Sequence, residues 1–482
     1  MNSKILPSDI PLVVDMDGTL THADTTFELL LRLFISNPVL SIFNLIRWYL
    51  IGKGTLKTEL FQRVGNKIDV KVLPYSEALF DSNLWNSTQK KSLISGGANG
   101  IVERVGLHLD CFSNVEGSTR EVNLTSHNKL SRLMEIYPNG FDYVGDSMQD
   151  ITVWKEARRA YGINISSRVE KKAKSKQINL EIISRKKSIL KAFLKNMRLH
   201  QWAKNTLLFL ILFLNILSID AANVCQLAIA FVSFGLVASS TYILNDMLDI
   251  DSDRSHHSKK YRPLASSALP IAHALIGMIG LLVLGLGLAI IISFSFTLML
   301  LAYTAFSLVY SFHLKRVPII DTMTLSGLFC WRILTGAVVI ELNFSQWFLI
   351  AMAFFFLSLA TAKRVIELQS KAKLSKDKEA KIMGRGYTTS DTDTMTVIGI
   401  VSGFISIITI AIYCLLDLDS VVSSSVGSIL LIAALFFWVS RLWLLVSRGE
   451  VDDDPIYFAL KDKVSLLTGC FLGVILLAEQ LL

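Results

Sequence analysis

An acidic run near the middle of the chain has the residue types and spacing for metal-assisted phosphate chemistry. Asn245 is followed by Asp246, Asp249 and Asp253. On a helix, spacings of three and four place these carboxylates on one face. At the end of an apolar span, three like charges on one face are costly unless a cation neutralises them. Mg²⁺ prefers oxygen ligands and often bridges carboxylates to substrate phosphates, so it fits this pattern. The alternative is a solvated acidic loop.

Basic and polar side chains follow the acidic run and recur in later loops. Cations of this kind can hold phosphate oxygens and balance the charge of a leaving group. The alternative is that they only mark the inner side of a membrane. Asp321 and Arg332 lie within an apolar stretch, where ions usually line a functional cavity. The candidate substrate-binding residues are Asn245, Arg254, His256, Lys259, Arg262, Tyr310, Lys315, Arg332 and Lys363, and the candidate catalytic ones are Asp246, Asp249, Asp253 and Asp321.

These charged segments separate long apolar stretches. Hydrophobic residues make up 52% of the 482 residues, and a membrane span needs about 20 mostly apolar residues. Lys and Arg gather in alternate loops and are absent from the loops between them, which predicts nine transmembrane helices with the N-terminus inside. The candidate stretches are 205–219, 225–245, 271–291, 294–311, 319–340, 345–362, 396–416, 425–447 and 464–482.

Two earlier segments bear on the membrane, and a further membrane span is the alternative for the first of them. Residues 29–52 are apolar but are interrupted by Arg32, Arg47 and Asn37-Pro38. We expect amphipathic helices there, lying on the membrane or covering the N-terminal domain. A basic run within residues 166–200 precedes the first span, and this position favours contact with anionic lipid over nucleic acid. The first residues lack the pattern of a signal peptide, so we expect the N-terminal domain in the cytoplasm.

The N-terminal part carries a second candidate site. An apolar run ends in Asp15-Met-Asp17-Gly-Thr, which indicates a buried strand that delivers two carboxylates to a loop. This pattern resembles the first motif of haloacid dehalogenase-like phosphatases. The resemblance implies that Asp15 is the nucleophile and Asp17 a general acid/base. It also implies that Ser95, in Leu-Ile-Ser-Gly, holds the phosphate.

Two further motifs of that family have counterparts downstream. Lys129, at a predicted helix start, matches the lysine that neutralises an aspartyl-phosphate. If no lysine reached the site, the domain would be a degraded scaffold. The segment Gly-Asp146-Ser-Met-Gln-Asp150 matches the last motif. The implied Mg²⁺ ligands are Asp15, Asp17, Asp146 and Asp150. The implied fold is a doubly wound α/β sheet with a helical cap at about 24–88.

The membrane part resembles the UbiA superfamily of intramembrane prenyltransferases through the pattern NDxxDxxxDR at 245–254. The resemblance implies nine helices around a central cavity, with Asp-rich loops that bind Mg²⁺ and a diphosphate. Members with aromatic substrates carry a second motif, DxxxD. Here Asp321 is followed by Leu325 instead of a second carboxylate, which disfavours aromatic prenylation.

One branch of that superfamily, the decaprenyl-phosphate phosphoribosyltransferases, is more similar. Its signatures have counterparts in order along the chain, at 198–205, 253–263, 310–315, 327–332 and 454–462. The first segment adds Lys204 to the substrate-binding candidates. The resemblance implies transfer of phosphoribose from phosphoribosyl pyrophosphate to a polyprenyl phosphate, with the lipid tail between apolar helices.

The sequence therefore predicts a haloacid dehalogenase-like domain at 1–165, a basic linker at 166–200 and a UbiA-like all-α membrane domain of nine helices at 201–482. We expect an integral protein of a bacterial inner membrane that uses Mg²⁺, a polyprenyl phosphate or diphosphate lipid and no nucleic acid. Phosphoribosyl transfer is the preferred function, with removal of the 5-phosphate by the N-terminal domain. Prenyl transfer from an allylic diphosphate to an aromatic or other acceptor, and a transporter or scaffold, remain alternatives.

Overall fold

The structure is a computed structural model, and it describes residues 10–213, 220–342, 345–374, 385–416, 422, 425–451 and 454–481. Its contacts divide it into two compact units. The front unit contains the described residues up to Met197 together with Ile243–Gly277. The membrane unit contains Arg198–Tyr242 and Met278–Leu482. The acidic run, which we assigned to the membrane domain, thus packs with the N-terminal domain.

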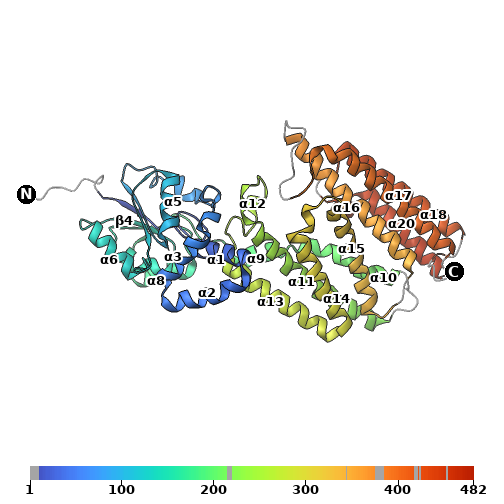
Figure 1. Cartoon of the computed structure of the whole chain (residues 1–482), viewed down its shortest axis with the longest axis horizontal. Coiled ribbons are helices and arrows are strands. Elements are labelled where there is room, and N and C mark those ends of the chain that lie inside the picture. The colour runs from blue at the N-terminus through green and yellow to red at the C-terminus, as the bar shows by residue number, and fades with distance from the viewer. Residues whose placement is uncertain are drawn as a thin grey trace, which may run out of the picture. The chain divides into compact units, whose positions relative to one another are not determined.

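A six-stranded parallel sheet forms the centre of the front unit (Figure 1). Its strand order is β3-β2-β1-β4-β5-β6. The central strand β1 has no exposed residue, because a parallel sheet is covered by helices on both faces. The strands are β1 Leu12–Val14, β2 Lys91–Ala98, β3 Phe112–Ser118, β4 Asp142–Gly145, β5 Arg159–Gly162 and β6 Leu180–Ile182.

The segment between β1 and β2, where a cap at about 24–88 was expected, forms a helical insertion. Asp24 caps the first helix by accepting hydrogen bonds from the N–H groups of Thr26 and Phe27. Asn37 separates the first two helices because Pro38 starts the second, a position where proline is tolerated. The helices are α1 Thr25–Ser36, α2 Pro38–Ile51, α3 Lys53–Val64 and α4 Glu77–Phe80. Neither α1 nor α2 is long enough to span a membrane.

The segment predicted as a basic linker, 166–200, is largely folded. It contains α8 Ser167–Ser175, strand β6 and α9 Ile189–Asn196. Strand β6 pairs in parallel with β5, so the sheet extends beyond residue 165. The error has a physical reason. The lysines of α8 occupy its exposed side, whereas Val169 and Ala173 are buried, a helical pattern that the high charge of the segment conceals.

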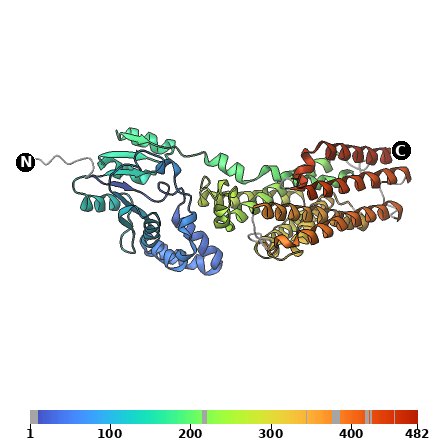
Figure 2. The same cartoon turned by 90° about the horizontal axis from the view of Figure 1, so that it is seen from above.

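Eight helices in the described part of the chain are long and apolar enough to cross a membrane, and the chain is an integral membrane protein. Among them α16, α17, α18 and α20 pack in succession (Figures 1 and 2). The eight are α11 Ala221–Leu248, α13 Ile271–Ile292, α14 Phe294–Phe312, α15 Ile320–Val339, α16 Gln346–Leu374, α17 Thr392–Leu416, α18 Ser425–Arg448 and α20 Lys463–Leu481.

The predicted count of nine spans is not confirmed. The first predicted span, 205–219, begins in a 3₁₀ helix, η5 Leu199–Phe209, and continues in the short helix α10 Leu210–Phe213. Residues 214–219 lie outside the described residues. Leu208 and Ile211 are fully buried here, so the apolar side chains of η5 and α10 contribute to the interior of the membrane unit.

Candidate active sites

The first candidate site lies where strand order reverses in the sheet. Strand β1 pairs with β2 on one side and with β4 on the other, and ligands of open parallel sheets bind beyond such a point. Asp15 follows β1, and Asp146 and Asp150 follow β4. One oxygen of each lies within 4.8 Å of the others. Gly18 has a φ of +78°, and a Cβ there would overlap the Asp146 carboxylate. These hard oxygen donors fit Mg²⁺.

Asp17, the fourth predicted ligand, does not belong to this group of three. Its carboxylate accepts hydrogen bonds of 3.1 Å from the N–H and the hydroxyl of Thr25, at the start of α1. Burial and the negative charges of Asp24 and Asp15 raise the pKa of Asp17 well above its usual value. The raised pKa favours the protonated form, which a general acid requires.

Lys129 reaches the same site from helix α6 (His127–Ile136). Its Nζ lies 3.0 Å from an Asp15 oxygen and 3.8 Å from an Asp150 oxygen. It also donates a hydrogen bond of 2.9 Å to the hydroxyl of Tyr143. Burial opposes the charge, but the carboxylates of Asp15 and Asp150 outweigh it and raise the pKa of Lys129. The charged lysine therefore lies between two of the predicted metal ligands.

A cavity of about 1150 Å³ opens onto these carboxylates. Ser95, fully buried on β2, lines it and is a hydrogen-bonding partner of Asp15. Lys57 enters from helix α3, and its Nζ donates to the carbonyl of Gly96 and to Asn123. Sequence reasoning missed Lys57, because it belongs to no motif and comes close to the strand ends only through the folding of the insertion.

The second candidate site is the acidic run at 245–253. Helix α11 ends at Leu248, and α12 spans Ile250–Ser255. Arg262 lies between two carboxylates, with its Nη1 3.3 Å from Asp246 and 2.7 Å from Asp253. Asp249 falls in the break between the two helices. The N–H groups of Asp249 and Asp253 still donate to the carbonyls of Asn245 and Asp249, so helical spacing continues through the break, and Asp246 and Asp253 face the same arginine.

Asn245 supplies an independent sign that a cation fits beside this run. Its Oδ1 is buried and accepts no hydrogen bond from the described residues, an arrangement that is costly without a partner. Amide and carboxylate oxygens are donors of the type that Mg²⁺ takes. Of the other predicted residues, His256 and Lys259 are exposed and Lys315 is half-buried.

Arg254, which was predicted to bind substrate, is held by contacts within the front unit. Its Nη2 lies 2.5 Å from Glu28 of α1, and its Nε donates to the carbonyl of Ala265. The side chain is only 2% exposed. Arg254 therefore joins the acidic run to helix α1 of the front unit, and it also lines the cavity described above.

Asp321, at the start of α15, is enclosed by cations. Its carboxylate pairs with Arg364 and with Arg385, the latter at 3.0 Å. The hydroxyl of Tyr310 donates a third bond at 2.9 Å. Glu367 forms ion pairs with both arginines, so these four side chains are neutral overall. The Asp321 side chain has no exposed surface, and among the described residues arginines already contact both of its oxygens.

A cationic cluster lies elsewhere in the membrane unit. Lys204 and Lys363 contact the same oxygen of Asp454, at 3.1 and 3.0 Å. The Lys204 ammonium also lies 5.9 Å from the ring of Phe329, which Arg332 contacts as well. Two lysines on one carboxylate leave a net positive charge. The cluster is therefore suited to an anion.

Arg332 is buried on α15 among aromatic side chains. It donates to the hydroxyl of Tyr303 at 2.7 Å and to Oδ1 of Asn205 at 3.2 Å. Its guanidinium also lies over the ring of Phe234. Asp321 pairs with other arginines, so the described structure shows no ion pair between Asp321 and Arg332.

Several residues that contact the candidate site residues were not selected from the sequence, and some of them could have been recognised more easily than others. Arg364 and Glu367 stand three apart on one helix, which is a readable pattern. Arg385 is 64 residues from its partner Asp321, and no local pattern announces that pairing. Asp454 was noted only as part of a segment match.

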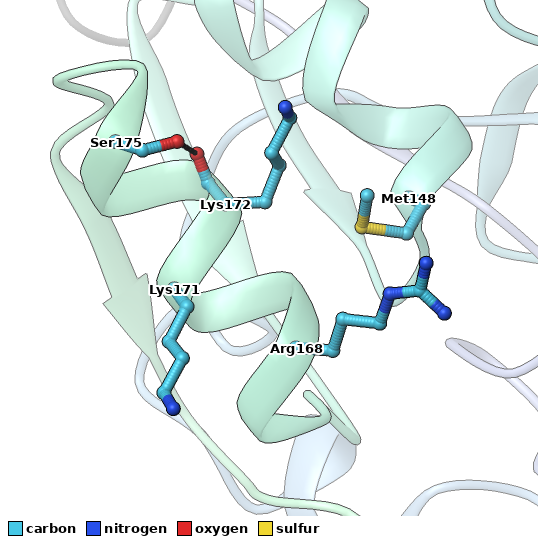
Figure 3. A pocket seen from close by; sticks show the side chains of 5 residues that line it. All are labelled: Met148, Arg168, Lys171, Lys172 and Ser175. Atoms are coloured by element: carbon cyan, nitrogen blue, oxygen red, sulfur yellow. Dashed lines mark hydrogen bonds between the residues drawn. The ribbon is translucent and has the colours of Figure 1, made fainter.

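A second, shallow cavity of about 410 Å³ borders α8. Figure 3 shows Arg168 extending toward Met148, whereas Lys171 points away. Lys172 and Ser175 complete the lining. No carboxylate or nucleophile other than the Ser175 hydroxyl lines it, and that hydroxyl bonds to the backbone of Lys172. This cavity is therefore a basic surface hollow without catalytic groups.

Comparisons with known proteins bear on the whole chain. Residues 202–460 match the UbiA prenyltransferase family. Uncharacterized protein y4nM of Sinorhizobium fredii is 33% identical over 469 residues, which cover 96% of this chain and 90% of that protein. Nodulation protein NoeC of Azorhizobium caulinodans is 31% identical over 282 residues, which cover 58% of this chain and 89% of that protein. Decaprenyl-phosphate phosphoribosyltransferase of Mycolicibacterium smegmatis is 34% identical over 189 residues, which cover 38% of this chain and 59% of that protein.

Proposed function

Because the chain belongs to the UbiA prenyltransferase family, we propose that it transfers a phosphoribosyl group from phosphoribosyl pyrophosphate to a polyprenyl phosphate. The observation that carries this proposal is that the carboxylate of Asp321 is already paired with two arginines of the protein. Prenyl transfer to aromatic acceptors, in the pattern described above, relies on a second acidic motif. Here Arg364, Arg385 and Tyr310 saturate that position. The partial similarity to a decaprenyl-phosphate phosphoribosyltransferase points to the same reaction.

The acidic run is assigned to the donor. Asn245, Asp246, Asp249 and Asp253 would hold Mg²⁺, which supplies positive charge to the departing diphosphate. Arg262, already between Asp246 and Asp253, is placed to contact phosphate oxygens as well. The bond between ribose C1 and the diphosphate oxygen breaks, and an oxygen of the lipid phosphate forms the new bond to C1. Diphosphate is the leaving group.

The cationic cluster is assigned to the acceptor. Lys204 and Lys363 carry two positive charges against the single charge of Asp454. The phosphate of a polyprenyl phosphate would balance this excess of positive charge. Binding there orients a phosphate oxygen as the nucleophile, and positioning of this kind is a large part of the catalysis of group transfer.

We further propose that the front unit is a phosphatase that removes the 5-phosphate from the lipid product. Asp15 attacks phosphorus and forms an aspartyl-phosphate, while Asp17 protonates the leaving oxygen. Lys129 and Ser95 hold the phosphoryl oxygens. A water molecule then hydrolyses the intermediate, releasing inorganic phosphate and free Asp15.

Two variants on one helix test the transfer reaction. The purified chain is incubated in detergent with Mg²⁺, decaprenyl phosphate and phosphoribosyl pyrophosphate labelled in the ribose, and the lipid is extracted. Asp246→Asn should abolish label in the organic phase. Asp220→Asn is the matched control, because Asp220 is exposed at the other end of α11. Equal labelling by the two variants would reject the donor site. Product from an allylic diphosphate and an aromatic acid, with no label transfer, would favour prenyl transfer.

A further inference from the structure

The cavity of the front unit is lined by more than the sheet and its helical insertion. The segment 260–273, which leads from α12 into α13, contributes Lys260, Tyr261, Ile271 and His273 to the same cavity as Asp15 and Asp146. Helix α13 is the most apolar of the candidate spans, with a mean hydropathy of 2.9. The first turn of a membrane span therefore forms part of the wall around the hydrolytic carboxylates.

Buried ion pairs fix this segment to the front unit. Arg254 pairs with Glu28, and these side chains are 2% and 1% exposed. Arg254 also donates to the carbonyl of Ala265, within the segment. Arg32 joins Glu28 to Asp251 at 2.6 and 2.5 Å. Removing one partner from such a buried network leaves an uncompensated charge. The wall is therefore a built part of the cavity.

The charge and size of the cavity describe its ligand. Nine Lys and Arg side chains line it, against six Asp and Glu, so an anion is favoured even beside the catalytic carboxylates. Its volume of about 1150 Å³ is at the upper end for small-molecule pockets. Ile271 and Ala272 add apolar surface at the start of the span. A ligand with phosphate at one end and an apolar chain at the other satisfies all three features.

We propose that the segment 260–273 is the specificity element of the front unit and selects a phosphate monoester attached to a membrane lipid over a soluble one. The apolar first turn of α13 receives the lipid end, and Lys260 contacts a second phosphate between lipid and sugar. This inference rests on the proposed phosphatase activity of the front unit.

The test compares two esters that carry the same 5-phosphate. The full chain in detergent hydrolyses decaprenyl-phosphoryl 5-phosphoribose or ribose 5-phosphate, and phosphate release gives kcat/KM for each. Ile271→Asn should lower kcat/KM for the lipid ester about tenfold, the effect of losing one buried aliphatic contact, and leave that for ribose 5-phosphate unchanged. Lys260→Ala, on an exposed side chain, should act in the same direction. Leu275→Asn is the matched control, because Leu275 lies one turn further and is 42% exposed.

The outcomes distinguish failure of the specificity element from failure of the phosphatase proposal. Equal losses for both esters, an equal loss in Leu275→Asn, or a wild type that hydrolyses ribose 5-phosphate as efficiently as the lipid ester would overturn the specificity element alone. If the wild type hydrolyses neither ester and resembles Asp15→Asn, the phosphatase proposal fails and this inference fails with it.

Discussion

Lysine and arginine side chains engage the candidate carboxylates in both units. Lys129 lies 3.0 Å from Asp15, and Arg262 lies 2.7 Å from Asp253. Arg364 and Arg385 enclose Asp321. A carboxylate with one cation nearby stays available to a ligand, whereas one enclosed by two arginines is neutralised by the protein itself. This difference, more than the presence of an aspartate, separates the proposed donor site from Asp321.

Lys204 makes this electrostatic account testable by pH. Burial and the neighbouring charge of Lys363 lower the pKa of Lys204 to about 8, with Asp454 opposing the shift. A lysine with a lowered pKa loses its charge as the pH rises through that value. We expect the KM for decaprenyl phosphate to increase between about pH 7 and about pH 9, by up to tenfold per pH unit above the pKa.

Lys204→Arg is the control for that pH profile, because arginine keeps its charge in this range. The variant should lose the alkaline increase in KM while the titration of the substrate stays the same. Identical profiles for the wild type and Lys204→Arg would contradict the assignment of Lys204 to the acceptor phosphate.

At the scale of elements, local sequence patterns predicted the break between α1 and α2 but not the end of α11. The Asn37-Pro38 break between α1 and α2 was readable, because proline starts a helix well and continues one poorly. The spacing of Asp246, Asp249 and Asp253 suggested one continuous helix. The structure instead ends α11 at Leu248, and no residue in the run is a helix breaker. Packing of 243–277 against α1 through Arg254 is a long-range contact, which periodicity does not contain.

Arg441 illustrates a pairing between elements that the sequence left open. This arginine of α18 makes two hydrogen bonds to Asp462, at 2.6 and 3.0 Å, just before α20. These bonds lower the pKa of Asp462 to about 2. Because the depressed pKa is below the range of enzyme assays, the pair stays charged in them. We expect Arg441→Ala and Asp462→Ala each to lower Tm in detergent, with a coupling energy of about 1 kcal/mol.

A double-variant cycle measures that coupling. The double variant should be only slightly less stable than either single variant, because each single substitution already removes the ion pair between Arg441 and Asp462. Strictly additive losses in Tm would show that Arg441 and Asp462 act independently and that α18 and α20 are not joined through them.

At the scale of the whole molecule, the sequence predicted two candidate sites, because each begins with acidic motifs of fixed spacing. Asp15, Asp146 and Asp150 converge although more than 120 residues separate the first from the others, since parallel strands bring their ends to one edge. The boundary between the units was not readable. Membrane helix α11 starts in one unit and ends in the other, whereas hydropathy places its whole length in the membrane part.

The most direct measurement is the mass of the lipid product made by the full chain from decaprenyl phosphate and phosphoribosyl pyrophosphate with Mg²⁺. The wild type should yield decaprenyl phosphate bearing ribose, and Asp15→Asn should yield the same lipid with one additional phosphate group. That pair of masses would establish both phosphoribosyl transfer and hydrolysis of the 5-phosphate by this chain. Unmodified decaprenyl phosphate from both proteins would contradict phosphoribosyl transfer, and the phosphorylated product from both would contradict the phosphatase.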